Sequence, residues 1–164
     1  MKKSIRRFVF ETNSSSTHSM CVTKNNVLDQ KLEYIKFSLG EFGWDYDNLR
    51  SVGEKASYLY TGILANNRDE LIDNIKEILQ KNDVQYDFEE PEFDTYSDGS
   101  RYLNNGGIDH SDELYDFLDI CKDEDEFMRY LFSSESFVRT GNDNSGSDVD
   151  INVSYDHDEY YKGN

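Results

Sequence analysis

Alternating and helix-spaced apolar residues divide the chain into short elements. Alternation of apolar or aromatic residues with polar ones is typical of half-buried strands. Proline cannot donate a ladder hydrogen bond, so Pro91 marks the segment before it as an edge strand. The pattern predicts six strands: Ile5–Phe10, Met20–Thr23, Glu33–Leu39, Gln85–Phe88, Ser136–Arg139 and Val149–Tyr155.

Helices are predicted where a start signal precedes an apolar stripe. Ser51-x-x-Glu54 is a capping box, in which each side chain satisfies the other residue's free backbone donor. Asn67 and Asp123 precede a glutamate at the same spacing, and Ser111 is a further candidate cap. Apolar residues follow each start at intervals of three and four: Leu59, Tyr60, Ile63 and Leu64; Leu71, Ile72, Ile75, Ile78 and Leu79; Leu114, Phe117, Leu118 and Cys121; Phe127, Tyr130 and Leu131.

The mixed order of these elements predicts an α+β fold. We expect a single compact domain over residues 1–164, with a small, mainly antiparallel sheet and about four helices. A chain of 164 residues supports one hydrophobic core and hardly two. Asp94–Gly107 is predicted to be a loop, and residues 156–164 are predicted to be a frayed tail.

Charge is distributed unevenly along this domain. Lys and Arg total 17 and Asp and Glu total 34, which gives a net charge of −17. Residues 1–83 hold 12 basic and 12 acidic residues, whereas residues 84–164 hold 5 and 22, so the second part carries 5 − 22 = −17. We therefore distinguish a neutral half, residues 1–83, from an acidic half, residues 84–155. The 12 Tyr and 10 Phe favour a folded core over disorder.

Several classes of protein are excluded. No apolar run approaches the roughly 18–20 residues that span a bilayer, and no apolar stretch follows Lys2 and Lys3 as in a secretory signal. Cys21 and Cys121 form neither a disulfide framework nor a CxxC zinc site, so a reducing cytosol is expected. The acidic half lacks the clustered Lys and Arg that duplex DNA binding requires.

The polar stretch near the N-terminus holds candidate catalytic residues. Glu11 and His18 are candidate proton-transfer groups, and Arg6 and Arg7 could clamp a phosphate in metal-free phosphodiester cleavage. The alternative is a polar turn between two strands with a solvated histidine.

The acidic half holds candidate partner-binding residues. Carboxylates separated by Tyr and Phe can imitate the phosphates and bases of a nucleic acid, and their complement is a basic protein. The alternative is that the negative charge keeps the protein soluble or adapts it to high salt, as in halophilic organisms. The candidates are Asp87, Glu89, Glu90, Glu92, Asp94, Asp98, Asp123, Glu124 and Asp125.

No metal ligand set or cofactor motif is predicted. Two acidic pairs, Asp94 with Asp98 and Asp148 with Asp150, leave a divalent cation such as Mg²⁺ as an open alternative. Neither pair matches the EF-hand pattern.

Three sequence segments resemble small proteins of bacteriophages and mobile elements. The resemblance covers roughly the first 65 residues and lies in Arg7–Ser19 (RFVFETNSSSTHS), Gly40–Trp44 (GEFGW) and Lys55–Thr61 (KASYLYT). Some such small acidic phage proteins are anti-CRISPR inhibitors, and some inhibitors of the type II effector truncate its guide RNA. The resemblance therefore implies location in the cytoplasm of a host bacterial cell and a CRISPR effector as the partner. It also implies Glu11 and His18 as candidate catalytic residues.

The charge pattern together with this resemblance implies a phage-type inhibitor of a nucleic-acid-binding host defence. It would act by acidic mimicry, by ribonuclease cleavage of guide RNA, or by both. The competing prediction is a phage accessory protein with no enzymatic activity and no nucleic-acid-related target.

Overall fold

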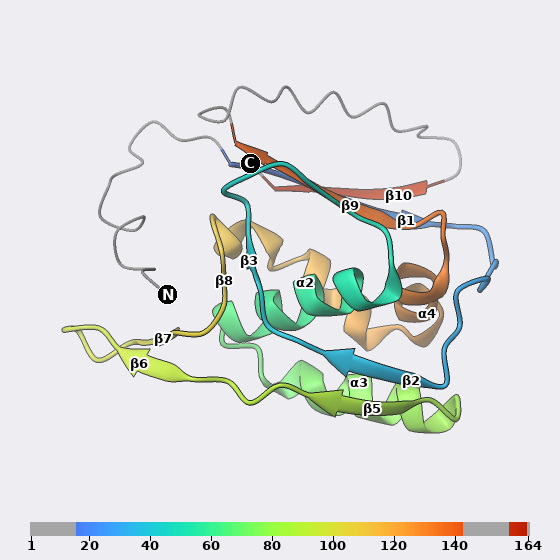
Figure 1. Cartoon of the computed structure of the whole chain (residues 1–164), viewed down its shortest axis with the longest axis horizontal. Coiled ribbons are helices and arrows are strands. Elements are labelled where there is room, and N and C mark those ends of the chain that lie inside the picture. The colour runs from blue at the N-terminus through green and yellow to red at the C-terminus, as the bar shows by residue number, and fades with distance from the viewer. Residues whose placement is uncertain (1–15, 143–157, 164) are drawn as a thin grey trace.

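The computed structural model describes residues 16–142 and 158–163, and it has the α+β fold that the element pattern predicts (Figure 1). Helices and strands alternate irregularly along the chain, as expected for this class. The predicted strands Ile5–Phe10 and Val149–Tyr155 lie outside the described residues. The elements are β1 (Ser16–Thr23), β2 (Tyr34–Phe37), β3 (Glu41–Phe42), β4 (Asp47–Leu49), α2 (Val52–Ala65), α3 (Glu70–Lys81), β5 (Gln85–Phe88), β6 (Phe93–Thr95), β7 (Arg101–Leu103), β8 (Gly107–Ile108), the 3₁₀ helices η1 (Ser111–Leu114) and η2 (Phe117–Lys122), α4 (Glu124–Phe132), β9 (Phe137–Asn142) and β10 (Asp158–Gly163).

A four-stranded antiparallel sheet covers one side of the core. Its strand order is β10-β1-β9-β4, so the first and last described strands are direct neighbours. Met20 on β1 lies opposite Val138 on β9. β1 is one of the two inner strands of this sheet, and every residue from His18 to Thr23 is buried.

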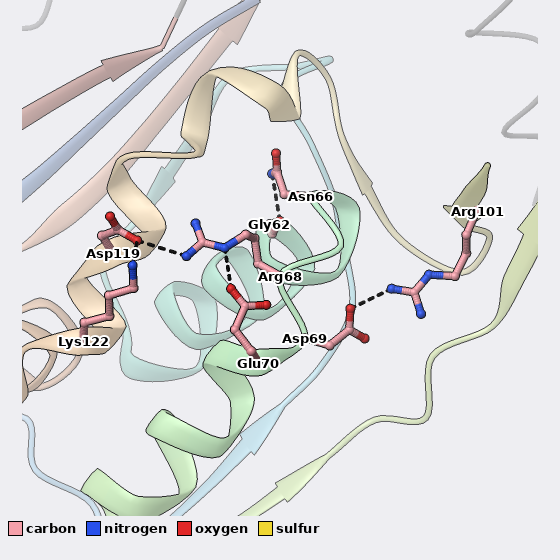
Figure 2. Close-up of polar contacts among 8 residues, drawn as sticks. All are labelled: Gly62, Asn66, Arg68, Asp69, Glu70, Arg101, Asp119 and Lys122. Carbon is pink, nitrogen blue, oxygen red and sulfur yellow. Dashed lines mark hydrogen bonds and ion pairs between the residues drawn. The ribbon is translucent and has the colours of Figure 1, made fainter.

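Helix α2 runs through the middle of the molecule. Figure 1 shows it between the four-stranded sheet and the β2–β5 pair. The predicted capping box is present, since Ser51 Oγ accepts from the Glu54 amide and Glu54 Oε2 accepts from the Ser51 amide. Ten of its 14 residues are buried, more than one face can provide, because elements pack around it on several sides. At its C-terminal end the Asn66 side chain donates to the Gly62 carbonyl (Figure 2).

Helix α3 is amphipathic and packs beside β5. Leu71, Ile75, Ile78 and Leu79 are buried, as the apolar stripe predicts. The predicted start at Asn67 is wrong: the helix begins at Glu70 after Asp69, and Asn67 has a left-handed backbone with φ of 55°. Asn67 therefore ends the turn after α2 instead of capping the next helix.

Two strand pairs are parallel, which the expectation of a mainly antiparallel sheet did not foresee. β2 pairs with β5 and β3 pairs with β8, and in each case α2 and α3 lie between the two strands along the chain. Ile35 and Phe37 of β2 are buried while Tyr34 and Lys36 are exposed, so the alternation itself is confirmed.

The segment predicted to be a loop contains a hairpin. β6 and β7 are antiparallel, with Asp94 opposite Tyr102. Gly99 has φ of 87°, a conformation that favours glycine, and its amide donates to the Tyr96 carbonyl to close the turn. The predicted frayed tail is also corrected, because residues 158–163 of it form β10 against β1.

The region after β8 forms 3₁₀ helices, which are more tightly wound than the α-helix that the sequence predicts. Leu114, Phe117, Leu118 and Cys121 are buried as expected, but they lie on two 3₁₀ helices. His110, with φ of 54°, precedes η1, and Ser111 does not act as its cap. Asp123 caps α4 as predicted, since its carboxylate accepts from the Glu126 amide at 2.8 Å.

Candidate functional site

The predicted catalytic residues divide between described and undescribed parts of the chain. Arg6, Arg7 and Glu11 lie outside the described residues. His18 is described, on β1, opposite Thr140 of β9. It is therefore the one member of the predicted set whose environment can be compared with the expected role.

His18 is fully buried and held from both sides of its ring. Its Nε2 lies 2.7 Å from the Asp109 carbonyl, which can only accept, so Nε2 carries the proton and donates. Its Nδ1 lies 2.9 Å from the Tyr58 hydroxyl and accepts from it. Burial lowers the pKa of His18 to about 4, although the hydrogen bond to Asp109 acts in the opposite direction.

This environment favours a structural role for His18. A neutral imidazole with no exposed surface has no path to a phosphodiester in this arrangement. The alternative of a solvated histidine also fails, because the ring joins β1 to α2 and to the segment after β8.

The predicted partner-binding residues fall into two groups along the fold. Six follow one another on β5, the connection after it and the β6–β7 hairpin, and Figure 1 shows β5 leading into β6 along one side of the molecule. Three lie at the start of α4. The Lys81–Glu124 ion pair places that start beside the end of α3, just before β5 begins. Seven of the nine are exposed, and Glu89 and Glu124 are half-buried.

Five of these nine carboxylates also have local structural contacts. Glu89 accepts from the Leu39 amide at 3.0 Å, Asp94 from the Thr95 amide and Asp123 from the first turn of α4. Hydrogen bonds from Ser100 lower the pKa of Asp98, and the bond from Lys81 lowers that of Glu124. Among the described residues, these contacts include a single ion pair to a member of the set.

The other four carboxylates have no such contact. Within residues 16–142 and 158–163, no hydrogen bond or ion pair reaches the side chains of Asp87, Glu90, Glu92 and Asp125, and all four are exposed. Charges of this kind remain fully available to a cationic partner.

Three of the nearby cations, Arg68, Arg101 and Lys122, are engaged by other carboxylates (Figure 2). Arg101 binds Asp69 at 2.6 Å, and Lys122 binds Asp119 at 2.9 Å. Arg68, almost completely buried, bridges Glu70 and Asp119 and so ties the α2–α3 connection to η2. These three cations therefore do not neutralise the predicted set, whose one ion pair among the described residues is Lys81–Glu124.

A cavity of about 200 Å³ lies at the base of the β6–β7 hairpin. Its lining includes Trp44, Tyr96, Tyr102, Arg101 and Asp109. The sequence did not predict this cavity, because Trp44 is more than 50 positions from the two tyrosines and no local pattern connects them. Only the clustering of Tyr96 and Tyr102 near Gly99 gave any signal.

The remaining predictions concern metals and membranes. In the described part of the chain, no group of three or more His, Cys, Asp or Glu side chains could hold a metal ion, and the pair Asp148 and Asp150 lies outside it. None of the helices there combines the length and apolar character that a bilayer crossing needs.

Comparison with known proteins gives no family assignment. No protein family, curated protein or solved structure matches this chain. The function proposed below therefore rests on the chain's own residues and on the resemblance of its N-terminal segments.

Proposed function

We propose that this protein is a stoichiometric inhibitor of a basic nucleic-acid-binding protein, and that it acts by occupying the groove in which the nucleic acid binds. The observation that carries the proposal is the exposed, unbalanced set of carboxylates along β5, the β6–β7 hairpin and the start of α4. Seven of nine are exposed, and one is ion-paired among the described residues. Their natural complement is a row of Lys and Arg side chains.

Aromatic residues between these carboxylates support mimicry over solubility alone. Phe93 and Tyr96 alternate with Asp94 and Asp98, and the Tyr96 ring is nearly half exposed, at 45%. A surface that serves only solubility gains nothing from exposed rings, whereas a nucleic-acid groove offers surfaces that stack on bases.

The class of target follows from the N-terminal resemblance. Some of the small acidic phage proteins that the N-terminal segments resemble are anti-CRISPR inhibitors, so the proposed target is a CRISPR effector in the host cell. Mimicry is favoured over guide-RNA cleavage, because His18 is buried and has a pKa of about 4.

A displacement assay tests the proposal. The purified type II effector is loaded with fluorescent guide RNA or target DNA, and the protein is added at increasing concentration. We expect release of the nucleic acid at a fixed molar ratio, with the RNA intact on a denaturing gel. Shortened RNA would instead support the ribonuclease alternative. If the protein binds neither the effector nor any other basic protein, the proposal is wrong and the alternative of a phage accessory protein is favoured.

Charge variants make this test specific. D87N/E90Q/E92Q removes three unpaired charges from the acidic stretch, and E33Q/D45N/D73N removes three exposed charges from the neutral half. An exposed pair contributes about 0.5 kcal/mol, so the loss of three should cost about 1.5 kcal/mol, and we expect about tenfold weaker displacement by the first variant. The second variant should displace nucleic acid as well as the parent does. Equal loss in both would show that net charge alone matters.

A further inference from the structure

Two arginines beside the four-stranded sheet have no acidic partner. Within residues 16–142 and 158–163, no hydrogen bond or ion pair reaches the guanidinium of Arg50 or Arg139. Acidic residues outnumber basic ones in this chain, 34 against 17, so two unpaired arginines side by side need an explanation. The other arginines in these ranges each donate to an oxygen atom: Arg68, Arg101 and Arg129.

The two guanidinium groups gather on one phenylalanine ring. Their carbons lie 4.6 Å and 4.7 Å from the centroid of Phe137, for Arg50 and Arg139 respectively. Arg139 is two positions after Phe137 on β9, and Arg50 follows Leu49, which pairs with Val138. Because side chains alternate along a strand and Val138 lies in the core, Phe137 and Arg139 project from the outer face of the sheet.

This arrangement is unfavourable in the chain alone. Like charges close together repel each other, and the Nε of Arg139 is buried with no hydrogen-bond partner among the described residues. The rest of the pair is accessible, because Arg50 is exposed and the terminal nitrogens of Arg139 are not among those buried atoms. Conflicts of this kind are retained where a ligand resolves them.

Two carboxylates close in sequence to Arg50 do not neutralise the pair. Asp47 pairs with Thr140, and its Oδ2 lies 3.4 Å from the Thr140 hydroxyl, so it projects from the inner face of the sheet. Glu54 Oε2 accepts from the backbone amides of Arg50 and Ser51 at 3.1 Å and 3.0 Å. Both carboxylates are therefore held by other groups.

The donors on this face fit phosphate oxygens. A guanidinium presents a planar fork of N–H groups that matches two oxygens of a phosphate or a carboxylate. The exposed Asn48, directly opposite Arg139, adds an amide donor to the same face. Two adjacent positive charges match consecutive phosphates of a strand better than one carboxylate. Phe137 is only 9% exposed, so it offers no surface to a base, and the contact would be independent of sequence.

The proposed partner brings such phosphates with it. A basic groove offers few carboxylates, and the anion that it carries is its nucleic acid. Figure 1 shows the four-stranded sheet on one side of α2, and β5 and β6 on the other. A strand can therefore approach the sheet from the side away from the acidic stretch, and salt screens exposed charges over about 8 Å at physiological ionic strength.

We propose that Arg50 and Arg139, with Asn48, bind backbone phosphates of the nucleic acid that stays on the partner. The phosphate site itself does not depend on the proposed function, whereas its place in the complex rests on it. The acidic stretch contacts the protein groove and displaces one strand, such as target DNA. The outer face of the sheet contacts a strand that remains, such as guide RNA.

Arginine side-chain resonances give a direct test with the whole protein. The Nε–H signals of Arg50 and Arg139 are assigned with R50K and R139K and are followed during titration with a 5′-phosphorylated uridine trinucleotide. We expect saturable shifts of both signals, whereas those of Arg68 and Arg101, which are held in ion pairs, stay in place. No shift at Arg50 and Arg139 would overturn the proposal.

Other probes separate the possible sources of the anion. We expect uridine, inorganic phosphate and a glutamate tripeptide each to bind at least about fivefold more weakly than the trinucleotide. Equal binding of the tripeptide would assign the site to an acidic protein segment, and equal binding of inorganic phosphate would assign it to the free ion. Either result would overturn contact with a strand.

Matched variants test the role of the guanidinium groups. R50Q/R139Q should weaken trinucleotide binding about tenfold, and R50K/R139K, which keeps the charge but loses the planar fork, about threefold. K31Q/K36Q removes two exposed charges near β2 and should leave binding unchanged. Equal loss in this control would show that net charge alone matters and would overturn the site. If R50Q/R139Q does not fold by thermal melting, the lysine variant carries the test.

The chain's own carboxylates are the competing occupant. Asp148 and Asp150, outside the described residues, follow β9 in the sequence. D148N/D150N should bind the trinucleotide as the parent does. If it binds at least about tenfold more tightly, these carboxylates occupy the site and the proposal is overturned.

Binding to the effector with and without guide RNA separates failure of this inference from failure of the proposed function. R50Q/R139Q should bind the RNA-loaded effector at least about threefold more weakly than the parent and the RNA-free effector equally well. D87N/E90Q/E92Q should bind both forms more weakly. If R50Q/R139Q matches the parent on both forms, the arginines do not contact the strand, although mimicry stands. If the trinucleotide binds but neither form of the effector does, the phosphate site stands and the proposed function is wrong.

Discussion

Polar groups are buried and hydrogen-bonded in the core around α2, whereas along the acidic stretch from β5 to β7 several are exposed and have no ion pair among the described residues. In the core, Lys55, Tyr58 and His18 are fully buried, and each has partners at hydrogen-bond distance. Lys55 Nζ, for example, donates to the carbonyls of Ser133 and Ser136. Along the acidic stretch, Asp87, Glu90 and Glu92 are exposed and have no ion pair among the described residues.

The difference separates groups that stabilise the fold from groups that are available for binding. A buried polar atom must be paired within the molecule, because its desolvation is costly. An exposed carboxylate stabilises little, and a surplus of one sign opposes compactness. Substitutions in the core should therefore change stability, whereas those in the acidic stretch should change binding.

The largest expected effect comes from placing a charge in the core beneath β5. Ile75→Asp puts an unpaired carboxylate at a fully buried position on α3 and should destabilise by about 3 kcal/mol or more. Asp73→Asn, at an exposed position on the same helix, is the control. Thermal melts measure both. An unchanged melting temperature for Ile75→Asp would contradict the packing of α3.

A pH titration tests the burial of His18. Its folded pKa of about 4 lies below the ordinary value of 6.5, so below pH 6.5 the unfolded chain binds a proton that the folded chain excludes. Stability is therefore lost as the pH falls from 6.5 towards 4. Between pH 7.5 and pH 5 we expect a loss of about 2 kcal/mol from this group.

A variant isolates that contribution from the many carboxylates. His18→Gln should lower stability at pH 7.5 but lose about 2 kcal/mol less than the parent on acidification, because the other groups titrate alike in both proteins. Denaturant unfolding at the two pH values measures the difference. Parallel pH profiles would mean that His18 is accessible to protons in the folded state.

A smaller effect is expected from the hydroxyl that holds His18. Tyr58→Phe removes the donor to Nδ1 and should cost about 1–2 kcal/mol, since the change occurs in the buried core. Tyr34→Phe, which removes an exposed hydroxyl, should leave stability unchanged. Equal melting temperatures for all three proteins would contradict the bond.

The smallest effect on stability should come from the acidic stretch. D87N/E90Q/E92Q should melt within about 2 °C of the parent or slightly higher, because it removes repulsion without breaking a described contact. A markedly lower melting temperature would show that these carboxylates stabilise the fold.

Local signals made much of the fold predictable. The capping box at Ser51 and Glu54, the cap at Asp123 and the stripe on α3 each depend on neighbours within one or two turns. All three are confirmed. Burial of Ile35 and Phe37 follows from alternation within a single strand.

Pairing between distant segments was not predictable. The parallel pairing of β2 with β5 depends on how α2 and α3 pack, which one sequence does not reveal. β6 and β7 are only three residues each, so their sequence resembles a loop. The turn between them depends on the left-handed backbone of Gly99, which the sequence alone does not reveal. β10 is charged and is stabilised by its place beside β1.

The candidate site was predictable only where composition sufficed. The nine carboxylates could be named because their charge is a property of the sequence. The burial of His18 could not, since its partners Tyr58 and Asp109 lie 40 and 91 positions away. The cavity around Trp44 was missed for the same reason.

The salt dependence of binding to the effector tests the central claim most directly. Affinity is measured from low to high salt for the parent and for D87N/E90Q/E92Q. If exposed carboxylates meet a cationic groove, the parent's affinity should fall steeply with salt, and the variant should show a shallower slope and converge with it at high salt. Affinity that is independent of salt, or identical slopes for the two proteins, would contradict the account.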